Sequence, residues 1–69
     1  MSMKKVSLQL YKDTQIAVSN INRYDSLERY ALTQVLIAAK KNEQIDDLFI
    51  QCAQKALKHR SLNTSQVAV

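Results

Sequence analysis

An alternating segment near the start of the chain constrains its fold more than any other feature. Val6, Leu8 and Leu10 alternate with polar residues and Tyr11 over positions 4–12. This period of two is typical of a β-strand with one apolar face. A single strand cannot satisfy its own backbone hydrogen bonds, and no second strand is evident downstream. The pattern therefore predicts that the strand pairs with its equivalent in a second copy, which makes an obligate homodimer.

The composition favours the same solution. A single domain of 69 residues buries little apolar surface and usually gains stability from disulfides, a metal or a partner. Cys52 is the single cysteine, and it lies two helical turns from His59 with no other soft ligand nearby. We therefore expect no disulfide, no metal and no other cofactor. The expected organisation is one small helical domain over residues 1–60, followed by a disordered tail over residues 61–69.

Charge and apolar content narrow the function classes. The net charge of +4 suits an anionic partner, and the absence of glycine excludes Gly-rich phosphate loops. The longest apolar run, residues 35–39, is too short to span a membrane. With a single cysteine, these features predict a cytoplasmic protein without membrane contact. No nucleophile has a supporting base, so we expect no enzyme activity.

The first helix has an uncertain start in the sequence. Asp13 or Thr14 can cap a short helix after the strand. The alternating segment can also be interpreted as an N-terminal extension of this helix, because Leu10, Thr14 and Val18 share a helical face. Both interpretations stay open for residues 4–11.

The second helix has clearer signals. Asp25 and Glu28 form a capping box, which predicts a helix from Ser26 to about Lys41. The residues expected to face inward are Leu27, Ala31, Leu32, Val35, Leu36 and Ala39.

A third helix carries the cleanest amphipathic pattern. Its apolar stripe consists of Ile45, Leu48, Phe49, Cys52, Ala53, Ala56 and Leu57. Asp46 and Asp47 near its start, and Lys58 and His59 near its end, match the helix dipole. No residue forces a break after the second helix, so a single long helix with a buried Asn42 is an alternative. The residues expected to bind a protein partner are Ile45, Leu48, Phe49, Cys52 and Leu57.

The order of strand, short helix and capped helix over the first 40 residues resembles the ribbon-helix-helix DNA-binding family of the CopG, Arc and MetJ type. The matching features are the basic start Lys4-Lys5, the alternation from Val6 to Leu10, and the capping box. The resemblance implies a dimer in which two strands form an antiparallel ribbon that enters the major groove. The chain differs from the family in having no glycine between the helices.

The resemblance also implies which residues would contact DNA. Lys5, Ser7 and Gln9 would read base edges, for which a lysine suits guanine and a glutamine suits adenine. Lys4 would lie nearer the DNA backbone. Arg29 would belong to the start of the second helix, whose backbone amides hold a phosphate in that family.

Two hypotheses follow. The first is a DNA-binding transcription regulator, such as a repressor, that acts as a ribbon-helix-helix-like homodimer. Its fold would be mainly α, with a short N-terminal strand followed by two or three helices. The second is an all-α helical hairpin that acts as a small protein-interaction module, for instance an adaptor, secretion chaperone or anti-factor. In the second, the stripe of the third helix is presented to another protein. An intermolecular two-stranded ribbon would distinguish the first from the second.

Overall fold

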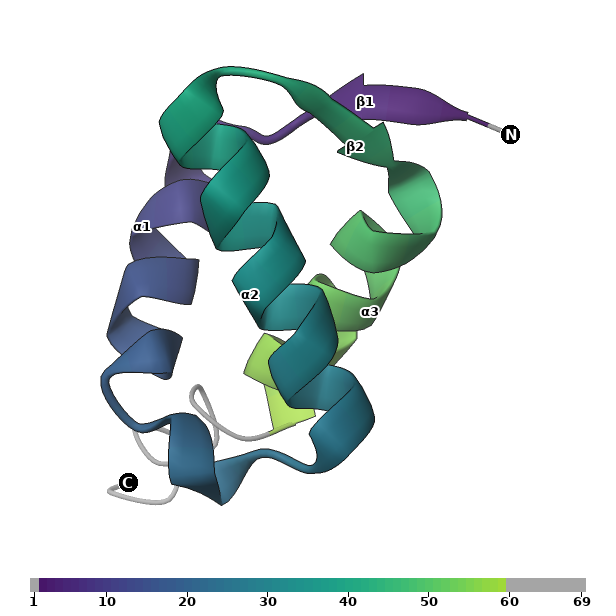
Figure 1. The fold of residues 1–69 in the computed structure, drawn as a ribbon. Coiled ribbons are helices and arrows are strands. Elements are labelled where there is room, and N and C mark those ends of the chain that lie inside the picture. Colours follow the sequence, from purple (N-terminus) through teal and green to yellow (C-terminus); the bar gives the residue numbers. More distant parts are fainter. Residues whose placement is uncertain (1, 60–69) are drawn as a thin grey trace.

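The computed structural model describes residues 2–59 and shows a mainly helical fold that begins with a short strand, as the sequence predicts. A small two-stranded sheet lies at one end of the helices (Figure 1). In chain order the elements are β1 (Met3–Lys5), α1 (Leu8–Val18), the 3-10 helix η1 (Ile21–Arg23), α2 (Ser26–Lys41), β2 (Gln44–Asp46) and α3 (Asp47–His59). The tail predicted over residues 61–69 lies outside the described residues.

The strand β1 pairs with a strand of its own chain. β1 and β2 are antiparallel, with Lys4 opposite Ile45, and the Asp47 amide also donates to the Ser2 carbonyl at 2.7 Å. The expectation that no second strand follows is therefore wrong, and the backbone no longer requires a partner chain. β2 was not recognised because its three residues are too few to show an alternating pattern, and its stability depends on pairing with β1.

Most of the alternating segment is helical. α1 begins at Leu8, and the Ser7 hydroxyl caps it by accepting a hydrogen bond from the Leu10 amide at 3.2 Å. Leu10 and Thr14, one turn apart, are both buried, whereas Leu8 is exposed. The helical interpretation therefore holds from Leu8 onward, because it buries Leu10, Thr14 and Ala17 together, and the strand is limited to Met3–Lys5.

The predicted second helix is confirmed at both ends. Asp25 accepts a hydrogen bond from the Glu28 amide at 2.8 Å, and Glu28 accepts one from the Asp25 amide at 3.0 Å. Asn42 ends the helix in the left-handed conformation, with φ of 57°. Asparagine tolerates this conformation better than most residues. The alternative of one long helix through Asn42 is wrong, because the chain turns there and enters β2.

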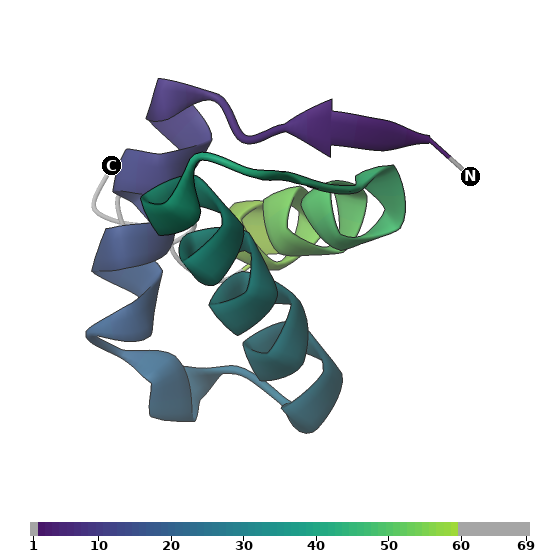
Figure 2. The same cartoon turned by 45° about the horizontal axis from the view of Figure 1, so that its top comes forward.

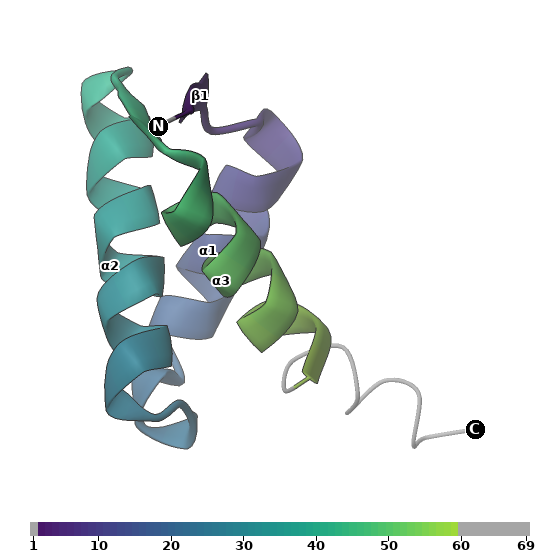
Figure 3. The same cartoon turned by 90° about the vertical axis from the view of Figure 1, so that its right-hand side faces the viewer.

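The core lies where α2 packs against α1 and α3 (Figures 2 and 3). Leu32 and Val35 of α2 are fully buried at its centre. Ala17 of α1 and Ala53 of α3 are also buried, and their small side chains allow close packing of the helices. The expectation that Leu27 lies in the core is wrong, since 69% of this residue is exposed.

Candidate functional site: an apolar groove between α2 and α3

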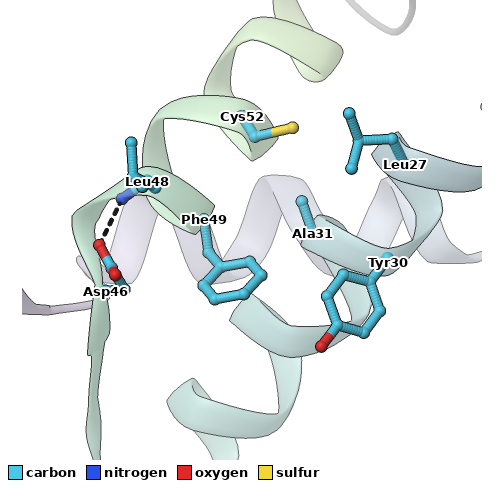
Figure 4. Close-up of a pocket in the computed structure, with 7 residues that line it drawn as sticks. All are labelled: Leu27, Tyr30, Ala31, Asp46, Leu48, Phe49 and Cys52. Carbon is cyan, nitrogen blue, oxygen red and sulfur yellow. Dashed lines mark hydrogen bonds between the residues drawn. The ribbon is translucent and has the colours of Figure 1, made fainter.

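An apolar groove with a volume of about 360 Å³ lies between the N-terminal halves of α2 and α3 (Figure 4). We call it the α2–α3 groove. It is lined by Leu27, Tyr30 and Ala31 of α2, by Asp46 of β2, and by Leu48, Phe49 and Cys52 of α3.

Three large side chains of the groove are mostly exposed to solvent. The exposed fraction is 69% for Leu27, 55% for Tyr30 and 68% for Leu48. Exposed leucines that are scattered singly are normal on a protein surface. A group of them around one hollow is less common in a monomer and marks a surface that another molecule can cover.

Two aromatic rings hold the walls of the groove together. Tyr30 and Phe49 pack edge to face, with ring centroids 5.6 Å apart and an interplanar angle of 62°. This geometry is one of the favourable arrangements for an aromatic pair and links α2 to α3. Figure 4 shows the Cys52 thiol directed toward Leu27, and the buried Ala31 lies between the two walls. The groove is therefore a hollow between packed side chains.

Asp46 is the one charged residue among those that line the groove, and its carboxylate helps to start α3. Its Oδ1 accepts a hydrogen bond from the Leu48 amide at 3.0 Å. The neighbouring Asp47 carboxylate lies 3.6 Å from the Lys4 ammonium and accepts a hydrogen bond from the side-chain amide of Gln51 at 2.6 Å. Carboxylates at a helix N-terminus are favoured by the helix dipole. Asp46 and Asp47 therefore both help to fix the start of α3.

The residues that the family resemblance assigned to DNA lie on several elements. Lys4 and Lys5 are exposed on β1, and Ser7 caps α1. Gln9 lies within α1, where its side-chain amide donates a hydrogen bond to the Asp13 carboxylate at 3.0 Å. Arg29 is half-buried on α2. The expectation that Lys5, Ser7 and Gln9 share one face of a strand is wrong, because the chain becomes helical after Ser7.

The predicted protein-binding stripe is only partly at the surface. Leu48, Phe49 and Cys52 line the groove, whereas Ile45 and Leu57 are buried in the core. Sequence reasoning did not assign the opposite wall, Leu27 and Tyr30, to a binding site. A leucine and a tyrosine three residues apart share one face of a helix, and this spacing could have indicated that Leu27 and Tyr30 form one apolar surface.

The described residues hold few other functional features. Within residues 2–59, no three or more His, Cys, Asp or Glu side chains are close enough to hold a metal ion together. None of the helices in this range is both long and apolar enough to cross a bilayer.

No known protein family matches this chain, and no curated protein or solved structure is significantly similar to it. The α2–α3 groove gathers three of the exposed large apolar residues, Leu27, Tyr30 and Leu48, around one hollow.

Proposed function

We propose that the protein is a small interaction module that binds another polypeptide in the α2–α3 groove. The observation that carries this proposal is the exposure of Leu27, Tyr30 and Leu48 around one apolar hollow. A groove between two helices suits apolar side chains that a partner presents from a helix, since such side chains recur every three or four residues along one face. Covering the groove would remove this apolar surface from water.

The chemistry of the groove favours a polypeptide over a small substrate. Small-molecule sites usually combine an apolar pocket with several convergent polar groups. Among the residues that line this groove, Asp46 is the single carboxylate, and it already accepts a hydrogen bond from the start of α3. No histidine, lysine or arginine lies among the lining residues to activate the Cys52 thiol. The residues that line the groove therefore offer mainly apolar contacts to a ligand.

A phage-displayed library of amphipathic helical peptides tests this proposal. The full chain is immobilised at a density low enough to keep its copies apart, and retained peptides are sequenced. Leu48→Glu places a charge in the groove, whereas Leu8→Glu is the matched control, because Leu8 is 67% exposed but does not line the groove. We expect the wild type and Leu8→Glu to enrich peptides with apolar residues three or four apart, and Leu48→Glu to lose this enrichment.

Two results would contradict the proposal. One is the absence of enrichment by the wild type, and the other is equal retention of the same peptides by Leu48→Glu. Circular dichroism of both variants establishes that they remain helical. We expect both to fold, because each replaced side chain is more than half exposed.

Binding of double-stranded DNA, as by a transcription regulator, is a second proposal. It is supported by the net charge of +4 and by exposed lysines at one end of the molecule. Lys4 and Lys5 lie on β1, and Lys40 and Lys41 end α2 shortly before β2, which pairs with β1 (Figure 1). These lysines suit contacts to phosphates, which give affinity without reading sequence.

The salt dependence of duplex binding tests the second proposal. We expect the logarithm of the binding constant to fall with the logarithm of salt concentration, and the slope to become shallower when Lys40 and Lys41 are replaced by glutamine. Lys58→Gln, at the far end of α3, is the control and should leave the slope nearly unchanged. If the wild type shows no duplex binding even at low salt, this second proposal is wrong.

A further inference from the structure

We infer that the polypeptide bound in the α2–α3 groove is a second copy of this chain. Two copies would meet groove to groove about a two-fold axis, with their α3 helices antiparallel. This inference rests on the proposed function, because it names the partner of the same groove. It differs from the obligate ribbon dimer that the sequence suggested, since β1 is already paired within the chain.

The groove presents both parts of a self-complementary surface. A two-fold contact uses the same patch on both copies, so the patch must contain projections as well as hollows. Leu27 and Leu48 project from the two walls, and the small side chains of Ala31 and Cys52 leave room between them (Figure 4). The leucines of one copy can therefore enter the hollow of the other.

The exposed apolar area is close to the lower limit for a specific dimer. With about 200 Å² for a large side chain that is fully exposed, Leu27, Tyr30 and Leu48 together expose on the order of 380 Å². Two such patches amount to roughly 770 Å². The half-buried Phe49 and Cys52 add to this area. Specific interfaces need about 1,000 Å².

The charge distribution of α3 favours an antiparallel pair. The helix has Asp47 in its first turn and Lys58 and His59 in its last turn. An antiparallel arrangement opposes the two helix dipoles, and it places the basic last turns of the two α3 helices at opposite ends of the contact, away from each other. A charge arrangement of this kind sets the orientation of a contact more than its strength.

The dimer should be reversible. Each copy has its own core, in which Leu32 and Val35 are fully buried, so folding does not require the partner. An interface of about 1,000 Å² lies in the range of weak, transient contacts. We therefore expect a dissociation constant on the order of 10–100 μM, and folded monomers below that range.

Sedimentation equilibrium of the full 69-residue chain provides the first measurement. Over about 1 μM to 1 mM, the weight-average mass should rise from one copy toward two. Leu48→Glu should weaken the dimer by about tenfold or more, whereas Leu8→Glu should change it by less than about twofold. The two leucines are almost equally exposed, and only Leu48 lines the groove.

The thiol of Cys52 provides a second measurement that needs no change in the groove. Cys52 is the single cysteine of the chain and lines the groove. Its rate of reaction with a maleimide should fall as the protein concentration passes through the dissociation constant, because the second copy covers it. In Leu48→Glu the rate should stay constant over the same concentrations.

The outcomes separate this inference from the proposed function. A monomer at all concentrations, or a dimer whose Cys52 reacts as fast as in the monomer, overturns self-docking. In either case, peptide enrichment that depends on Leu48 would still support the proposed function with a different protein as partner. A dimer that protects Cys52 and is lost in Leu48→Glu supports the inference.

Discussion

Thr14 is the buried residue whose replacement tests the packing of α1 most sharply. Its side chain is fully buried, and its hydroxyl makes no hydrogen bond within the described part of the chain. A buried hydroxyl without a partner costs about 1–3 kcal/mol of stability. Valine has nearly the same shape and leaves no cavity. Both residues are β-branched and have similar helix propensities, so the backbone term is nearly unchanged.

We therefore expect Thr14→Val to raise the free energy of unfolding by about 1 kcal/mol. For a domain of this size, this corresponds to an increase in Tm of about 4–8 °C. Thr33→Val on α2 is the matched control, because Thr33 is exposed and its hydroxyl can bond to water. We expect this control to change the free energy of unfolding by less than about 0.5 kcal/mol.

Thermal and urea denaturation of both variants, followed by circular dichroism, provide the assay. A loss of 1 kcal/mol or more in Thr14→Val would refute the reasoning, since it would mean that the hydroxyl has a hydrogen-bond partner in the folded protein. An equal gain in Thr14→Val and Thr33→Val would also refute it, because burial would then not be the cause.

Further predictions concern caps and packing, and each is checked by urea denaturation. Asp25→Ala removes one half of the capping box and should cost about 1 kcal/mol. Asn42→Ala should cost about 1 kcal/mol because of the left-handed backbone, whereas Asn42→Gly should be neutral within about 0.5 kcal/mol. Val35→Ala, at a fully buried position, should cost about 2–3 kcal/mol. Replacing a fully buried phenylalanine by alanine costs about 3–5 kcal/mol. Phe49→Ala should cost less than this, because the ring of Phe49 is only half-buried beside the groove.

The parts of the fold that were predicted well have local signals. Asp25 and Glu28 define the start of α2 by a reciprocal pair of hydrogen bonds over three residues, and this pair is present. Leu32 and Val35 were expected to face inward, and both are fully buried. Such features depend on neighbours in sequence, so the pattern alone is sufficient.

The start of α1 could not be decided from the pattern. Leu8 and Leu10 fit a strand face, while Leu10 and Thr14 fit a helix face. The helix forms because Ser7 caps it and because Leu10 and Thr14 reach the core together. β2 was missed for a related reason, since it is defined by pairing with β1, about 40 residues earlier in the chain.

The groove was only half predicted. Leu48 was assigned to a protein-binding stripe and is exposed, as that assignment requires. Leu27 was expected in the core because it belongs to the apolar period of α2. A period shows which residues share a face, but only the packing of α3 against α2 determines which part of that face is covered.

NMR spectra of the isotopically labelled chain show directly whether a second copy docks in the α2–α3 groove. In a dilution series from about 1 mM to about 10 μM, we expect the shifts of Leu27, Tyr30 and Leu48 to move with one common dissociation constant. The exposed apolar residues of α1, Leu8 and Ile16, should keep their positions. Shifts that move at Leu8 and Ile16 but stay fixed around the groove, or no movement anywhere in the series, would contradict the claim.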